Sequence, residues 1–212
     1  MLTLTDARSW YPHDDAVHGF DHIERVYAIA QRLAAEEGAD WEIVSAAALL
    51  HDVEGSHPGS GKRASHHEYS AEFAAQVLQQ EGWDPARIAA VQHCIRTHRF
   101  RGDGSEPPQT LEAKVLFDAD KLDVLGAIGA ARTVGYAALN RQPVFAVPSQ
   151  KFLETGEKEP GEPHSSYHEY LFKLRKISDR LFTPSARAIA AQRQAYLAGF
   201  YEQLAAEVRG ER

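Results

Sequence analysis

The chain has almost no cysteine, since Cys94 is the single one among 212 residues. A lone thiol cannot close an internal disulfide, and a zinc site built from several cysteines is excluded. Such a composition is typical of proteins from a reducing compartment. We therefore expect a cytoplasmic protein.

Long hydrophobic runs are also missing. No stretch approaches the roughly 20 apolar residues of a membrane span, and the first residues contain no apolar segment of signal-peptide length. We expect no membrane partner.

Positive charge is in deficit, with 23 Lys and Arg against 30 Asp and Glu, for a net charge of −7. General nucleic-acid binders gain affinity from clustered cations, so we expect no nucleic-acid partner. A small anionic substrate is still compatible, because a pocket can be locally basic on an acidic protein.

Apolar residues recur at helical spacing, and no segment alternates like a strand. Ile23, Val26, Ala30 and Leu33 follow one helix face, which Gly38 ends. The pattern predicts an all-α fold, with helices over about 21–37, 41–53, 65–78, 84–98, 110–139, 166–181 and 184–208.

Local signals refine these helices. Ser65 and Glu68 have the spacing of a capping box, and Asp84 before a proline is a helix start. The helix over 110–139 is expected to kink at Gly126 or Gly129.

The length favours one domain over residues 1–212, with a core at about 15–140 and C-terminal helices at 166–208 packed on it. Residues 140–165 contain four prolines and two glycines. We expect them to be a substrate lid or partly disordered.

His51 and Asp52 close the apolar run 41–50. A carboxylate beside a hydrophobic wall costs several kcal/mol unless it is paired, hydrogen-bonded or bound to a cation. Neighbouring residues of an ideal helix diverge by about 100°, a restriction that relaxes in the last turn, where this pair stands.

His22 at a helix start and Asp120 inside a later helix complete a set of two imidazoles and two carboxylates. This mixture suits one open Mn²⁺ or Mg²⁺ site, and Ni²⁺, Fe²⁺ or Zn²⁺ could replace these ions in preparations. Each residue alone has an ordinary explanation: a helix-dipole contact for His51, a core position for His22, a cap or a Lys121 salt bridge for Asp120. A buried metal centre explains the four together.

The pattern formed by His22, His51-Asp52 and Asp120 resembles the HD-domain superfamily of metal-dependent phosphohydrolases. The stretches 18–26, 48–53, 118–132, 168–174 and 183–193 are similar to one bacterial subgroup, the YedJ/YpgQ-type HD hydrolases. The resemblance covers nearly the whole chain. It implies a single HD-type helical bundle and a nucleotide pyrophosphohydrolase that converts (d)NTP to (d)NMP and pyrophosphate.

One position departs from the family pattern. HD-type 5′-nucleotidases carry an acid three residues beyond the motif aspartate, where this chain has Gly55. Glu54 could take the place of this acid only if the loop turns its side chain inward. The residue that acts as general acid or base is therefore not assigned from the sequence. We predict catalytic roles for Asp52, Glu54 and Asp123, the last to orient a ligand histidine or the attacking water.

Candidate substrate contacts surround the motif, since phosphate needs cations or hydrogen-bond donors. Arg25 shares a face with His22, but it could instead pair with Asp21 or Glu24. Solvated surface positions are the alternatives for the two lysines. The candidates are Arg25, Lys62, Lys121, His18 and His67.

Further histidines raise a two-metal alternative. His66, His67, His93 and His98 are available as extra ligands. The spacing of His93 and His98 does not suit one helix face, whereas His66 and His67 at a helix start could bind phosphate oxygens or a second ion, or cap the helix. One tightly bound divalent ion is the favoured reading.

The ligand residues do not separate related reactions. The alternatives are an HD-type phosphomonoesterase or phosphodiesterase, and a non-catalytic nucleotide-binding regulatory protein. A nucleotide is the expected partner, and the sequence leaves a homodimer open.

Overall fold

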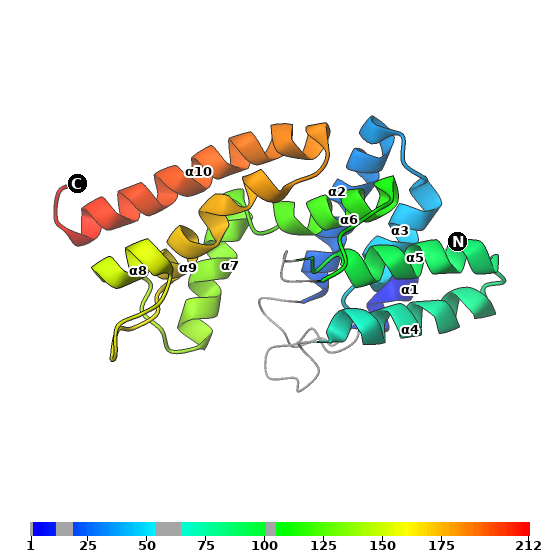
Figure 1. The fold of residues 1–212 in the computed structure, drawn as a ribbon, viewed down its shortest axis with the longest axis horizontal. Coiled ribbons are helices and arrows are strands. Elements are labelled where there is room, and N and C mark those ends of the chain that lie inside the picture. Colours follow the sequence, from blue (N-terminus) through cyan, green and yellow to red (C-terminus); the bar gives the residue numbers. More distant parts are fainter. Residues whose placement is uncertain (1, 12–18, 54–64, 101–104) are drawn as a thin grey trace. The chain divides into compact units, whose positions relative to one another are not determined.

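The computed structural model describes residues 2–11, 19–53, 65–100 and 105–212. These ranges are α-helical and contain no β-strand, which confirms the all-α prediction. They fall into two compact units (Figure 1). The N-terminal unit comprises residues 1–120 with 182–186, and the C-terminal unit comprises 121–181 with 187–212. The single domain expected from the length stays a prediction.

The N-terminal unit is built around α3 (Trp41–Leu50), which is buried from Ile43 to Leu50. A helix that is apolar on all sides belongs in the middle of a core. α2 and α5 pack against α3, and α4 lies along α5. The helices of this unit are α1 (Leu4–Arg8), α2 (Phe20–Glu37), α3, α4 (His66–Gln80), α5 (Pro85–Thr97) and most of α6 (Leu111–Leu122).

Two predicted helix boundaries are confirmed. Gly38 ends α2 with a φ of 77°, a left-handed conformation that glycine adopts at little cost, and its N–H donates to Ala34 O. Asp84 caps α5 by accepting from the Ala86 N–H, and Pro85 is the first helical residue.

The capping box predicted at Ser65 is wrong. Ser65 does precede α4, but its side chain makes no capping hydrogen bond. The Glu68 carboxylate instead accepts from Arg96 Nε on α5, at 3.0 Å. An ion pair to a neighbouring helix has replaced the local bond that the spacing suggested.

The helix predicted over 110–139 is interrupted rather than kinked. It stops after Leu122, and α7 (Gly126–Leu139) begins again with Gly126 at a φ of 71°. Among the described residues, no single helix is long and apolar enough to cross a membrane; α6 and α7 meet that criterion only when taken together as a bent pair.

The C-terminal unit contains α7, α8 (Gln150–Thr155), α9 (Ser166–Phe172) and α10 (Pro184–Val208, from Arg187 onward). The continuous helix predicted over 166–181 is wrong, because α9 ends at Phe172 and two 3₁₀ turns follow, Leu174–Lys176 and Ser178–Arg180. Leu174, Ile177 and Leu181 are buried there at spacings of three and four. Such spacing suits an α-helix equally well, so the sequence could not tell the two apart.

Residues 140–165 include α8 and a hydrogen-bonded turn centred on Glu162. Its carboxylate accepts from the N–H and the hydroxyl of Ser149, both at 2.7 Å, and from the Glu159 N–H at 2.6 Å. It also lies 3.0 Å from Nε2 of the buried His168 in α9. The segment is therefore tied to α9, and its role as a lid stays a prediction.

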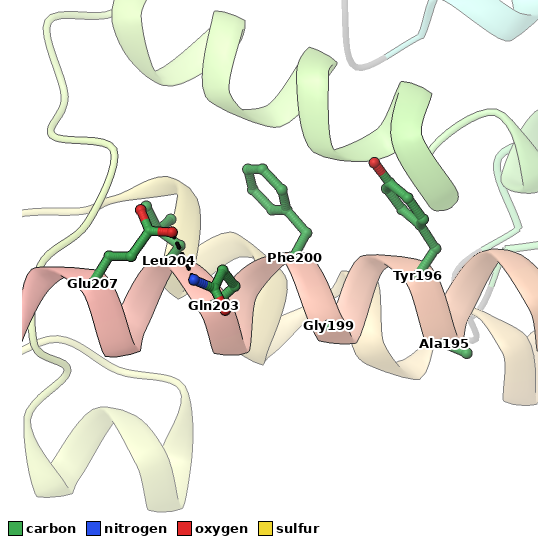
Figure 2. Close-up of a pocket in the computed structure, with 7 residues that line it drawn as sticks. All are labelled: Ala195, Tyr196, Gly199, Phe200, Gln203, Leu204 and Glu207. Carbon is green, nitrogen blue, oxygen red and sulfur yellow. Dashed lines mark hydrogen bonds between the residues drawn. The ribbon is translucent and has the colours of Figure 1, made fainter. Parts of the chain in front are cut away.

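Cys94 is fully buried in α5, and burial raises the pKa of its thiol well above the usual range. On α10, a depression is lined by apolar and polar side chains, among them Tyr196, Phe200 and Leu204 (Figure 2). No residue that the sequence predicts to bind metal or substrate lines it.

Candidate metal centre

Four predicted ligands come from three helices of the N-terminal unit. His22 stands in the first turn of α2, His51 and Asp52 follow the end of α3, and Asp120 lies in the last turn of α6. The side chains of His22 and His51 are 4% and 0% exposed, whereas those of Asp52 and Asp120 keep 19% and 16%. The imidazoles are thus enclosed and the carboxylates reach partly into solvent.

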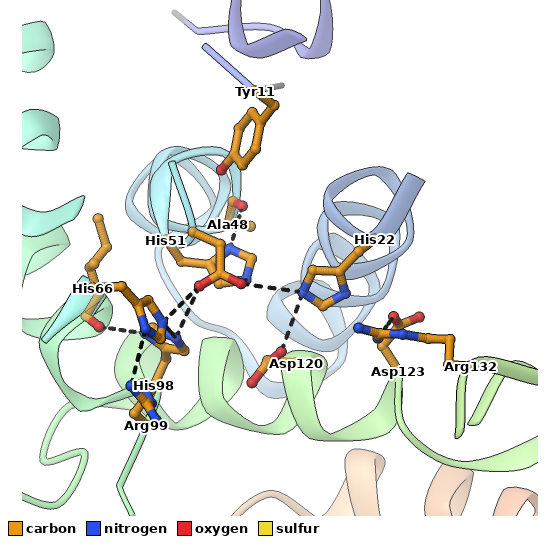
Figure 3. Close-up of polar contacts among 12 residues, drawn as sticks. Tyr11, His22, Ala48, His51, His66, His98, Arg99, Asp120, Asp123 and Arg132 are labelled. Atoms are coloured by element: carbon orange, nitrogen blue, oxygen red, sulfur yellow. Dashed lines mark hydrogen bonds and ion pairs between the residues drawn. The ribbon is translucent and has the colours of Figure 1, made fainter. Parts of the chain in front are cut away.

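The donor atoms converge (Figure 3). Asp52 Oδ2 lies 3.9 Å from Nε2 of both His22 and His51, and Asp120 Oδ1 lies 3.5 Å from His22 Nε2. Donor atoms of His22, His51 and Asp52 lie within 4.8 Å of one another. Atoms that bind one ion at 2.0–2.6 Å are at most about 5 Å apart, so this spacing fits a single cation.

His51 is oriented as a ligand would be. Its Nδ1 is 2.9 Å from Ala48 O, while its buried Nε2 has no hydrogen-bond partner among the described residues. Burial lowers the pKa of His51 to about 4, against the opposing charge of Asp52. The ring is therefore neutral near pH 7 and offers a lone pair. An unsatisfied buried nitrogen beside a carboxylate fits a bound cation.

Asp52 stays ionised. Burial would raise the pKa of its carboxyl, but the charge interactions with His51 and His98 and the close approach of His66 Nε2 outweigh burial and lower this pKa well below its usual range. The site thus keeps a negative charge at neutral pH, as cation binding requires.

A second group forms on the other oxygen of Asp52. His66, the first residue of α4, places Nε2 at 2.9 Å from Asp52 Oδ1. His98, the residue after α5, places its own Nε2 at 3.5 Å from the same oxygen. The two histidine Nε2 atoms are 3.3 Å apart, and all three donor atoms lie within 4.8 Å of one another. The sequence named both histidines as possible extra ligands but placed them in different helices, and it did not predict that they meet.

The remaining predicted residues have mixed surroundings. Arg25 pairs with Asp21, the alternative that the sequence left open, and His67 Nε2 lies 3.7 Å from the Glu68 carboxylate. Lys121 and Asp123 belong to the C-terminal unit, where the buried Asp123 carboxylate accepts from Arg132. Three of the predicted residues lie outside the described ranges: His18, Glu54 and Lys62.

Two residues of this region were not singled out from the sequence. Arg99 Nη1 lies 3.1 Å from His66 Nδ1, across a separation of 33 positions that no local spacing reveals. Asp118 is fully buried and accepts from the N–H groups of Phe182 and Thr183 and from the Thr183 hydroxyl. Its carboxylate holds the distant segment 182–186 on α6 and is a structural group.

Comparisons with known proteins agree with this geometry. The family model described as "HD domain" matches residues 19–125. The uncharacterized protein YpgQ of Bacillus subtilis is 28% identical over 195 residues, which covers 91% of this chain and 85% of YpgQ. The crystal structure of B. subtilis YpgQ in complex with ADP superposes with a TM-score of 0.73 and 26% identity, over 99% of this chain and 100% of that one. An HD-superfamily hydrolase from Bacillus thuringiensis gives a TM-score of 0.70 and 26% identity, over 97% and 96% of the two chains.

Proposed function

Because the chain belongs to the HD-domain family, we propose that it is a divalent-metal-dependent phosphohydrolase, and specifically a nucleotide pyrophosphohydrolase that converts (d)NTP to (d)NMP and pyrophosphate. The observation that carries the proposal is the ionised Asp52 carboxylate beside the unsatisfied Nε2 of His51. Support for a nucleotide comes from the relative YpgQ, which was crystallised with ADP.

His22, His51, Asp52 and Asp120 would hold the ion, with two imidazole nitrogens and two carboxylate oxygens. We favour Mn²⁺ or Mg²⁺, because mixed imidazole and carboxylate donors suit an open site that also admits phosphate oxygens. When bound, such an ion lowers the pKa of water toward neutrality and offsets the negative charge that develops at phosphorus.

The chain's own residues would orient the reactants. Attack of water on the α-phosphorus forms one P–O bond and breaks the bond to the β-phosphate oxygen, so that pyrophosphate leaves. Arg25, Lys62 and Lys121 are proposed to offset phosphate charge, with His18 and His67 as further contacts. Proton transfer is proposed to involve Glu54 or Asp123, and the Asp52 carboxylate is proposed to orient the water.

The reaction is tested by measuring pyrophosphate and orthophosphate released from a panel of ribo- and deoxynucleotides with Mn²⁺. We expect pyrophosphate from triphosphates. Orthophosphate from monophosphates would establish the phosphomonoesterase alternative, and turnover of phosphodiester substrates alone would establish a phosphodiesterase. A protein that binds nucleotide and metal but turns over none of these substrates would be a regulatory binding protein.

Replacement of Asp52 by Ala should lower turnover by about 100-fold or more, because even residues that only support metal ligands cost 10–100-fold when changed. The helical circular dichroism should persist. Asp179→Ala, which removes an exposed carboxylate of the C-terminal unit, is the matched control and should retain full activity. An Asp52→Ala protein with wild-type turnover would refute the assignment.

A further inference from the structure

The neighbours of each imidazole nitrogen determine which nitrogen carries the proton. A backbone carbonyl only accepts, so a ring nitrogen bonded to it must donate. His51 Nδ1 lies 2.9 Å from Ala48 O and His98 Nδ1 lies 2.6 Å from Ile95 O. Both rings therefore carry the proton on Nδ1 and present the lone pair of Nε2, which is the form that binds a metal through Nε2.

His66 has the opposite arrangement (Figure 3). Its Nδ1 faces Arg99 Nη1 at 3.1 Å. A guanidinium stays protonated and has no acceptor, so it can only donate to Nδ1. Because His66 Nδ1 accepts this hydrogen bond, the proton of the ring is on Nε2.

The surroundings of Nε2 require the same form. Asp52 Oδ1 at 2.9 Å is an acceptor, and so is His98 Nε2 at 3.3 Å, because the proton of His98 is used at Ile95 O. A hydrogen bond from His66 to either group needs a proton on His66 Nε2. Contacts on both sides of the ring thus select the same tautomer.

We propose that Arg99 is a positioning residue that keeps His66 in the Nε2–H form, with this N–H bonded to His98 Nε2 and close to Asp52 Oδ1, rather than as a metal ligand. The inference rests on the proposed metal ligation by Asp52 and deepens it. The proton of His66 Nε2 then lies beside Asp52 Oδ1, while Oδ2 faces Nε2 of His22 and of His51. A second ion between Asp52, His66 and His98 would need the lone pair of His66 Nε2, which Arg99 disfavours.

The tautomer can be read directly in metal-free protein by long-range ¹H–¹⁵N NMR of the histidine rings, with His66→Gln used to assign the His66 signals. We expect a protonated Nε2 and an unprotonated Nδ1 for His66, and the reverse for His51 and His98. A His66 ring protonated on Nδ1 would overturn the proposal. This NMR measurement needs neither metal nor substrate, so it tests the tautomer of His66 independently of the proposed function.

The second measurement counts bound Mn²⁺ per chain after gel filtration. Wild type and Arg99→Lys, which keeps an obligate donor, should bind one ion. Arg99→Glu should bind two, because a carboxylate at Nδ1 draws the proton there and frees Nε2. Arg99→Gln, whose amide oxygen can also accept, serves if the glutamate variant folds poorly.

Arg96→Glu is the matched control for the charge change. Arg96 lies one turn earlier on α5 and pairs with Glu68, so this variant should still bind one ion. Two bound Mn²⁺ ions per chain in wild type would overturn the role of Arg99. The same holds if every Arg99 variant binds one ion and keeps the His66 Nε2–H signal unchanged. No ion in wild type with that signal present would count against the proposed function and leave the tautomer assignment standing.

Discussion

Asp118 and Asp120 stand two positions apart on α6, and the helix gives them different tasks. Residues separated by two positions diverge by about 200° around a helix. Asp118 therefore bonds the segment 182–186, while Asp120 contacts His22. The sequence singled out Asp120 because it completes a ligand set. It could not reveal the role of Asp118, whose partners are 64 and 65 positions away.

We expect Asp118→Ala to destabilise the protein and Asp120→Ala to weaken metal binding. Removing Asp118 leaves buried N–H and O–H donors without an acceptor, at about 1–3 kcal/mol each, so the loss should reach about 3 kcal/mol. Urea unfolding in the presence of EDTA measures the first effect and Mn²⁺ titration the second. Equal stability of the two variants in EDTA would contradict this division of roles.

Some residues of the candidate site could be predicted from the sequence and others could not. It grouped His22, His51 and Asp52 because a carboxylate after an apolar helix needs a partner, and the fold does place their donor atoms together. Arg99 was not predicted from the sequence because it contacts His66 rather than the ligand residues. Arg99 and His66 meet only when α4 and the end of α5 lie side by side. Ligand roles themselves stay proposals.

At the scale of elements, helices with strong end signals were predicted well. Gly38 and Asp84 act within a few residues, so local sequence suffices there. The capping box at Ser65 was predicted wrongly because the Glu68 carboxylate bonds to a neighbouring helix instead. The region after Phe172 was predicted wrongly because its apolar spacing suits an α-helix and 3₁₀ turns equally well. Local spacing fixes a helix, but tertiary contacts decide how its ends are used.

The turn around Glu162 shows an electrostatic contribution from one element. Burial raises the pKa of this carboxyl, but hydrogen bonds from Ser149, His168 and the Glu159 N–H outweigh burial and lower the pKa to about 2. An acid with a lowered folded-state pKa contributes stability above its unfolded value of 4.5, and this stability is lost as the pH falls toward 2.

We therefore expect Glu162→Gln to be less stable than wild type at pH 7, with a difference that narrows between pH 4.5 and 2. Thermal unfolding at pH 7, 4 and 3 measures it. Glu159→Gln, which removes an exposed carboxylate from the same turn, is the control and should change stability little. A difference between Glu162→Gln and wild type that stays constant with pH would rule out this explanation.

At the scale of the whole molecule, binding of an ion should couple to folding. A ligand present at 100 times its dissociation constant stabilises the folded state by about 2.7 kcal/mol. We expect EDTA to lower the melting temperature and Mn²⁺ to restore it, as differential scanning calorimetry can follow. Asp52→Ala should show no Mn²⁺-dependent shift, and an equal shift in that variant would place the ion elsewhere.

The comparisons extend along almost the entire chain, since the YpgQ and B. thuringiensis structures align with 99% and 97% of it. The fold class could be read from the sequence because helical apolar spacing is a local pattern, and the family could be read because His22, His51-Asp52 and Asp120 resemble the HD motif. The nucleotide, a cytoplasmic location and a homodimer stay predictions, because residue spacing does not encode the shape of a substrate pocket or of a subunit contact.

The buried Cys94 makes the protein convenient for chemical labelling. Its thiol is enclosed by α5 and its neighbours and has a raised pKa, so the reactive thiolate is scarce at neutral pH. A fluorophore or spin label attached through a cysteine introduced at the surface would therefore report on that position alone, without prior replacement of the native residue.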